Sequence, residues 1–90
     1  MIPQKIRILG IDDIYIIYLM GNGLYIGEIA KILTLDYTTV RRRIQNIEYA
    51  FGTMLEKKGA KKKRVLTEIG QEIVEVCTTF INEFVKYTDA

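Results

Sequence analysis

The sequence predicts a mainly α fold of the α+β kind, with a short N-terminal strand, a three-helix core, a β-hairpin and a long C-terminal helix. Apolar residues recur every three or four positions in four segments, which is the period of an amphipathic helix. Between residues 54 and 66 this period is lost, and Gly59 lies near the middle of a hairpin pattern. Ninety residues suffice for one core, so we expect a single domain over residues 1–90.

The composition is that of a soluble globular protein, with 49% hydrophobic and 27% charged residues. No apolar run approaches the roughly 18–20 residues that a membrane-spanning helix needs, and no secretory signal is visible. Cys77 is the single cysteine, so the sequence predicts no internal disulfide. A reducing cytoplasm is therefore the expected location.

The N-terminal residues predict a strand followed by a buried helix. Residues 5–9 alternate between polar and apolar side chains, as a short strand does, and Gly10 ends the pattern. Asp12 is expected to cap a helix over residues 12–21. The side chains of this helix are apolar nearly all round, which predicts burial on most sides.

Two more helices follow, joined by a tight turn. The first spans residues 26–33 and places apolar side chains on one face. In the turn, Leu35 is expected to fill the space between the helices and Asp36 to cap the second one. The second helix, residues 37–51, carries one apolar stripe made of Tyr37, Val40, Ile44, Ile47 and Phe51. Arginine and amide side chains occupy other parts of its circumference, and Tyr49 is expected to cover the edge of the core.

The remaining residues predict a hairpin over 54–66 and a helix over 68–87 that Thr67 caps. Two neighbouring apolar stripes cover about half of this helix, more than the ~100° of an ordinary surface helix. One stripe contains residues 69, 73, 76, 80, 84 and 87, and the other contains residues 74, 77, 81 and 85. We expect one stripe to pack on the core and the other on a second copy, with a dimer interface formed by Val74, Cys77, Ile81 and Val85. The alternative is a helix that lies deeper in its own monomer.

The charges are distributed unevenly along the chain. Residues 38–64 contain nine Lys or Arg and two Glu, a net charge of +7, whereas the rest of the chain carries −5. A cationic segment that includes a helix with a polar face is typical of a polyanion-binding surface. The alternative is a basic surface that only meets solvent.

Several motifs match those of a known family. They are Ile29-Ala30-Lys31-Ile32-Leu33, Val40, the segment from Ile44 to Gly52, Leu55, and Leu66-Thr67-Glu68-Ile69-Gly70. With the order of the elements, they resemble the winged helix-turn-helix, more specifically the N-terminal DNA-binding domain of LysR-type regulators and the related ModE-type domain. Two positions depart from the LysR pattern: Arg41 stands where Ser is common, and Glu56 where Phe usually follows the leucine.

The resemblance implies binding of double-stranded DNA, with the helix over 37–51 in the major groove and pairing of two copies through the last helix. The implied DNA contacts are Thr38, Thr39, Arg41, Arg42, Arg43 and Gln45 on the helix, and Lys61, Lys62, Lys63 and Arg64 on the hairpin. Arginine can read guanine and glutamine can read adenine through paired hydrogen bonds, whereas threonine suits a phosphate or a thymine methyl.

Three alternatives stay open for these residues. The sequence does not say which arginine meets a base and which a phosphate. Arg43 either contacts a base, or it forms an intramolecular ion pair or a phosphate contact. The hairpin lysines contact the DNA backbone or form a solvated loop that keeps an edge strand from pairing with neighbours.

We therefore expect a sequence-specific DNA-binding protein: a homodimeric transcriptional regulator on a palindromic site, without an effector domain of its own, and nucleoid-associated if prokaryotic. The alternatives are a winged helix used for protein–protein contact and a nonspecific architectural DNA-binding protein. RNA is less expected because the major groove of A-form RNA is too narrow for a helix.

The sequence gives little reason to expect an enzyme. It has no histidine, no glycine-rich phosphate loop and no cluster of metal ligands, and Cys77 lies on an apolar stripe, where cysteine usually serves packing. No catalytic residue, metal or cofactor is predicted.

Overall fold

The computed structural model describes residues 9–60 and 63–88, with the side chain of Lys63 left aside. Within these ranges the elements are α2 (Ile11–Gly21), α3 (Ile26–Leu33), α4 (Tyr37–Phe51), β1 (Leu55–Lys58), β2 (Lys63–Leu66) and α5 (Glu68–Thr88). The mainly helical class with one small hairpin is confirmed, and each helix begins and ends within one residue of its predicted bounds. The strand predicted over residues 5–9 lies outside the described residues apart from Leu9, which packs against the core.

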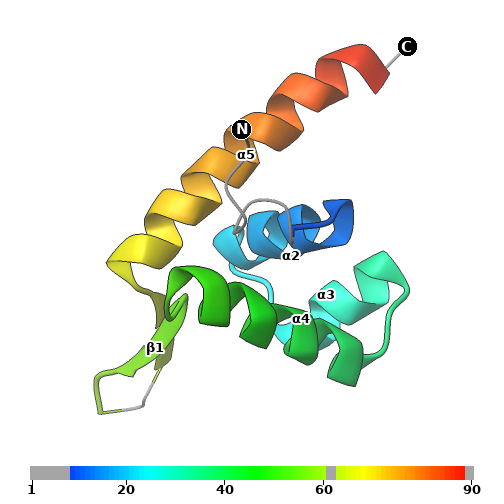
Figure 1. Ribbon diagram of the computed structural model, residues 1–90. Helices are drawn as coiled ribbons and strands as arrows, with labels where there is room; N and C mark the ends of the chain where they lie inside the picture. The colour runs from blue at the N-terminus through cyan, green and yellow to red at the C-terminus, as the bar shows by residue number, and fades with distance from the viewer. Residues whose placement is uncertain (1–8, 61–62, 89–90) are drawn as a thin grey trace.

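Helix α2 lies at the centre of the molecule, with α5 on one side and α3 and α4 on the other (Figure 1). Ile16 and Ile17 of α2 are completely buried, as the apolar pattern predicted. The other buried hydrophobic side chains are Leu19, Met20, Ile29, Ala30, Val40, Ile44, Ile47, Met54, Cys77 and Ile81. The core therefore joins all four described helices to the start of the hairpin.

The start of α2 differs from the prediction. The helix begins at Ile11, and the backbone N–H of Gly10 donates to Oδ2 of Asp13 at 2.8 Å. Asp13, rather than Asp12, therefore ties the chain entering the helix to its first turn. Asp13 is also buried, with 7% of its surface exposed.

The three-residue turn between α3 and α4 fixes the angle of the second helix. Thr34 takes a left-handed conformation with φ 56°, and the N–H of Leu35 donates to the carbonyl oxygen of Ala30 at 2.9 Å. Leu35 packs against the core as predicted. Asp36 is the residue before α4, but its side chain makes no capping hydrogen bond there.

The apolar stripe of α4 faces the interior, with one exception at its first residue. Val40, Ile44 and Ile47 are buried and Phe51 is half-buried against the core. Tyr37, the first residue of the stripe, is 52% exposed. A helical side chain leans toward the N-terminus and covers the preceding turn. Tyr37 is the first residue of α4 and has no preceding turn, so its side chain points beyond the end of the helix.

Hydrogen bonds fix the junction from α4 through the hairpin to α5. Oε2 of Glu48 accepts the N–H of Met54 at 2.8 Å. Thr67 caps α5 as predicted, since its Oγ1 accepts the N–H of Gly70 at 3.0 Å, and the same hydroxyl contacts the carbonyl of Thr53. These bonds place the hairpin beside α4.

The hairpin has the predicted form. Its strands pair antiparallel with Leu55 opposite Leu66 and Lys57 opposite Arg64, and Gly59 in the connection has a φ of 81°. A φ of this sign favours glycine because it has no Cβ.

The two apolar stripes of α5 do not divide as the sequence predicted. Val74, Cys77 and Ile81, assigned to the dimer interface, lie on the side of α5 that packs on the chain's own core. A Cβ on Gly21 of α2 would overlap the side chain of Val74, so the missing side chain at Gly21 lets α5 seat on this stripe. The alternative of a helix deeper in its own monomer therefore holds for these three residues, while Val85 is 44% exposed.

The other stripe of α5 is half-buried at Ile69 and Ile73, and its later residues are left at the surface. Val76 is 69% exposed, Phe84 54% and Tyr87 85%. The last turns of the helix extend past α2, away from the rest of the molecule (Figure 1). In the described part of the chain, no helix combines the length and apolar character needed to cross a membrane.

Candidate nucleic-acid interface

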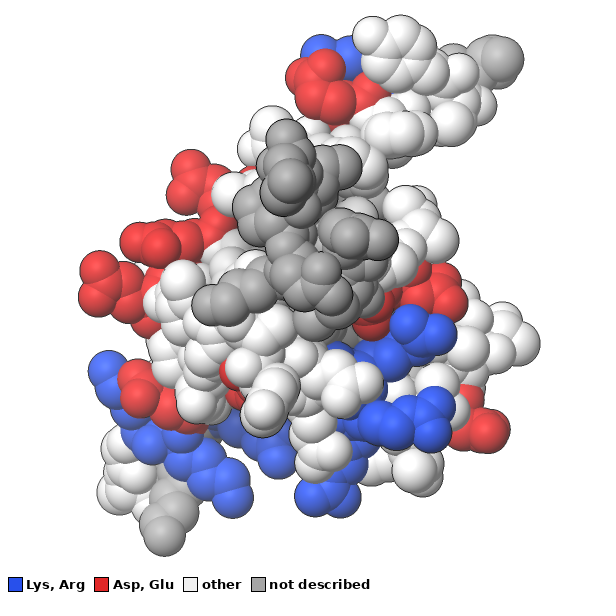
Figure 2. Space-filling view, in the orientation of Figure 1, with Lys and Arg blue, Asp and Glu red and all other residues white. Residues whose placement is uncertain are grey.

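The outward face of α4 carries most of the side chains expected to contact DNA. Thr38, Arg41, Arg42 and Gln45 are exposed, and Thr39 is half-buried. The basic side chains gather over the half of the molecule that contains α4 and the hairpin, whereas many acidic side chains lie over α5 (Figure 2). The charge asymmetry of the sequence is therefore also an asymmetry of the folded surface.

Tyr49 lies on this outward face too. It is 95% exposed, so it does not cover the edge of the core as the sequence predicted. Successive residues of an α-helix are about 100° apart, which puts residues 38, 42, 45 and 49 within one sector opposite the buried stripe. We call these four residues the ridge of α4.

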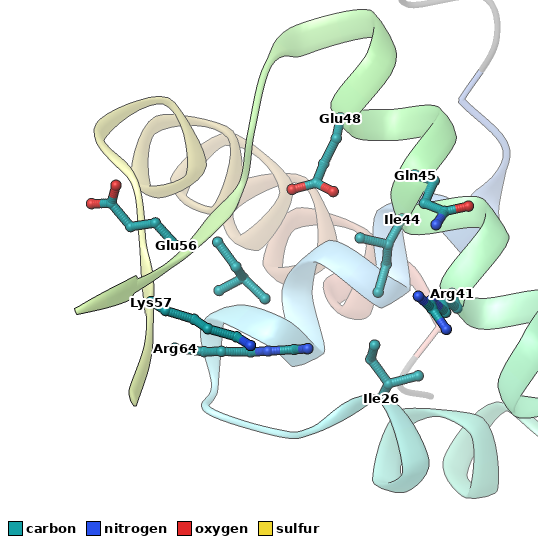
Figure 3. Close-up of a pocket in the computed structure, with 9 residues that line it drawn as sticks. Ile26, Arg41, Ile44, Gln45, Glu48, Glu56, Lys57 and Arg64 are labelled. Carbon is teal, nitrogen blue, oxygen red and sulfur yellow. The ribbon is translucent and has the colours of Figure 1, made fainter. Parts of the chain in front are cut away.

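A hollow of about 230 Å³ lies between α4 and the hairpin, and we call it the hairpin-side hollow. Lys57 and Arg64 extend side by side from the two strands toward Arg41 on α4 (Figure 3). Glu48 points into the hollow, whereas Glu56, which also lines it, turns its carboxylate outward and pairs with Lys58 at 3.3 Å (Figure 3). Three cationic groups thus converge on one side of the ridge.

The sequence did not single out Lys57. Its place follows from the strand register, which sets Lys57 directly opposite Arg64 and Lys58 directly opposite Lys63. Directly opposed residues of an antiparallel pair project on the same face, and like charges in such pairs are destabilising. Symmetric counting about Gly59 would have paired Lys57 with Lys61, so the sequence did not predict this register.

A second hollow, of about 450 Å³, lies on the other side of α4, between this helix and the start of α2. We call it the α2-side hollow. Its polar lining comes from Arg42, Arg43, Asn46 and Tyr49 of α4 and from Asp13 of α2. Asn46 is exposed, and like Lys57 it adds to the residues that sequence reasoning selected.

Arg43 forms an ion pair inside this hollow. Its Nη1 donates to Oδ1 of Asp13 at 3.3 Å, and the Arg43 side chain is 34% exposed. Its Nε is buried and has no hydrogen-bond partner among the described residues. Of the two alternatives for Arg43, the structure shows the intramolecular ion pair.

The hairpin residues are placed less completely. Arg64 is exposed and lines the hairpin-side hollow. Lys63 belongs to β2 by its backbone, and Lys61 and Lys62 lie outside the described residues. The structure therefore places Arg64 and Lys57 as the hairpin's contribution to the surface beside α4.

Cys77 is buried against the core, and desolvation raises the pKa of its thiol above the ordinary value of 9.0. A raised pKa lowers the thiolate fraction, and the thiolate is the nucleophilic form. Within residues 9–60 and 63–88, no group of three or more Cys, Asp or Glu side chains is arranged to hold a metal ion.

The chain matches no protein family model, and no curated protein and no solved structure is significantly similar to it. The functional interpretation therefore comes from the residues and their geometry.

Proposed function

We propose that this chain is a winged helix-turn-helix protein that binds double-stranded DNA sequence-specifically and regulates transcription as a homodimer. In this proposal α3 and α4 form the helix-turn-helix, α4 enters the major groove, and the hairpin is the wing. The observation that carries the proposal is the surface of α4: its apolar stripe is buried while Arg41, Arg42 and Gln45 are exposed.

The dimensions support this use of α4. The major groove of B-DNA is ~12 Å wide and accepts one α-helix. Helix α4 has 15 residues, and its exposed side chains include the types that hydrogen-bond to base edges and phosphates. Because the opposite face packs on the core, the helix is held rigidly in position.

The hairpin supports a polyanionic partner. The cross-strand pair of Lys57 with Arg64 brings like charges together. Such pairs lower the stability of a hairpin by themselves. A negatively charged DNA phosphate beside these side chains would attract both of them and offset their mutual repulsion. The arrangement therefore favours a bound polyanion.

The exposed stripe of α5 supports pairing of two copies. Phe80 and Phe84 stack with ring centroids 4.9 Å apart, and with Val76 and Tyr87 they form an apolar strip along the outer side of the helix. In this proposal the strip packs against the same strip of a second copy. Two DNA-binding heads would then read a palindromic site with half-sites about one helical turn apart.

Selection of bound duplexes from a random pool tests the proposal. We expect an enriched motif with two-fold symmetry, recovered at low salt and bound again when synthesised alone. Binding without any enriched motif would identify a nonspecific architectural protein instead. Failure of the protein to retain any duplex at low salt would reject DNA binding altogether.

A further inference from the structure

Two exposed tyrosines border a third hollow, which the proposed contacts with duplex DNA leave unused. This hollow of about 430 Å³ lies where the loop after α2, the start of α4 and the hairpin meet, and we call it the aromatic hollow. Tyr25, just before α3, is 69% exposed, and Tyr37, the first residue of α4, is 52% exposed. Both line the aromatic hollow. We propose that it binds an unpaired base of a DNA strand, stacked on the tyrosine rings, an inference that rests on the proposed DNA binding.

The rest of the lining is mostly apolar. It includes Met20, which is buried, and Leu24, Ile26 and Leu55, which are half-buried. All four side chains belong to the core or pack against it, so they are held firmly in place. Ligand pockets are usually about 300–1,000 Å³ in volume and apolar apart from a few polar groups. The aromatic hollow has both properties.

The backbone around the tyrosines is well held. The N–H of Tyr25 donates to Oε1 of Glu28 at 3.0 Å, and its carbonyl oxygen accepts the N–H of Ile29 at 3.0 Å. Tyr37 belongs to the first turn of α4. A ligand that stacks on these rings would therefore find their backbone already ordered, which reduces the entropy lost on binding.

Arg64 gives the aromatic hollow a positive charge. Its exposed side chain lines this hollow and also the hairpin-side hollow, where Lys57 and Arg41 lie (Figure 3). Among the described residues that line the aromatic hollow, none is acidic. The lining therefore favours a ligand that combines a flat apolar group with a negative charge, which is the chemistry of a nucleotide.

This combination of groups favours an unpaired base over a paired one. A duplex presents mainly phosphates and sugars along its backbone, and its stacked bases expose only their edges in the grooves. Proteins that bind single strands combine a cationic groove with aromatic side chains on which bases stack, and arginine adds a cation–π contribution. Tyr25, Tyr37 and Arg64 supply these groups beside the surface proposed to meet the duplex. A base held there would favour local opening of the DNA next to the hairpin.

The first test compares the selected duplex with versions in which a short mismatch bubble is moved through the site and its flanks, and measures affinity by fluorescence anisotropy. We expect one bubble position to strengthen binding about tenfold, which equals about 1.4 kcal/mol and lies within the usual range for one base stacked on an aromatic side chain. Abasic units in that bubble keep the backbone unpaired but remove the bases, and they should abolish the gain. A scan without any gain, or a gain that survives the abasic units, would overturn the proposal.

The second test locates the base on the protein through the ratio of bubble affinity to paired affinity. Tyr25→Ala and Tyr37→Ala should each lower this ratio, whereas Tyr25→Phe and Tyr37→Phe keep a ring and should preserve it. Tyr49→Ala is the matched control, because Tyr49 is also exposed but does not line the aromatic hollow. It should leave the ratio unchanged. An unchanged ratio in either alanine variant at position 25 or 37, or an equal drop in Tyr49→Ala, would contradict the assignment.

The outcomes distinguish this inference from the function on which it rests. A protein that binds the paired duplex but gains nothing from any bubble would leave the proposed function intact and reject the base-binding site. A protein that binds neither the paired nor the bubbled duplex at low salt would reject both. Tyr25 and Tyr37 are exposed, so their variants should fold, and circular dichroism checks this directly.

Discussion

Single residues show where the sequence pattern is ambiguous. Three successive arginines look alike in the sequence, yet Arg41 and Arg42 are exposed and Arg43 pairs with Asp13, thirty positions earlier. The position of residue 43 on the helix, close to the buried stripe, explains the difference. Helical periodicity predicts the direction of the Arg43 side chain. Its acidic partner, Asp13, is known only from the packing of α2 on α4.

The Arg43–Asp13 pair should contribute to stability. Arg43→Met leaves a buried carboxylate without its cationic partner, and we expect the free energy of unfolding to fall by about 1–2 kcal/mol, within the range for an unsatisfied buried group. Urea denaturation measures this loss. In the double variant Asp13→Asn, Arg43→Met the two losses should be less than additive. Strict additivity would mean that the two side chains do not interact in solution.

Gly70 illustrates a residue whose conservative replacement should be costly. A Cβ at this position would collide with the backbone carbonyl of Met54, which cannot move aside as a flexible side chain could. We expect Gly70→Ala to lower the free energy of unfolding by about 1–3 kcal/mol, the usual cost of overpacking. Thermal or urea unfolding measures the effect.

Gly27→Ala is the control for this prediction. Gly27 also lies in the first turn of a helix, but a Cβ there meets open space. Alanine should leave stability unchanged or raise it by about 0.5–1 kcal/mol, because glycine loses more entropy on folding. Equal losses in both variants would contradict the claim that the α5 start packs tightly on the Met54 carbonyl.

At the scale of elements, periodicity predicted the helices well and their contacts less well. Apolar spacing and caps such as Thr67 are local signals, so the bounds of α2 to α5 could be derived from the sequence. The choice between the two stripes of α5 could not, because it depends on Gly21, the residue of α2 that makes room for Val74. The pairing of Lys57 with Arg64 likewise depends on the register of two strands.

The revised assignment of α5 changes the expected effect of charged substitutions. Ile81 is buried in the chain's own core, so Ile81→Glu should destabilise the monomer. Phe84 is 54% exposed on the outer stripe, so Phe84→Glu should leave the fold intact and separate the proposed dimer. Sedimentation measures the mass, and circular dichroism measures the fold. A Phe84→Glu protein that still sediments as a dimer would place the interface elsewhere.

At the scale of the whole molecule, the fold gathers basic side chains on one part of the surface, which the small net charge does not reveal. The net charge is only +2, but basic side chains gather around α4 and the hairpin, and many acids lie along α5 (Figure 2). Such a separation steers a polyanion toward one face and keeps it from the other. The last turns of α5 extend away from α4 and the hairpin (Figure 1).

The central claim is that this basic face binds DNA phosphates, and the salt dependence of duplex binding tests it most directly. For a protein with 6–10 phosphate contacts, affinity falls by about 10³–10⁵ between 50 and 200 mM salt. We expect a fall of this order for this protein, with a linear plot of log K against log salt. Affinity that stays constant across this range, or no binding at 50 mM, would contradict the account.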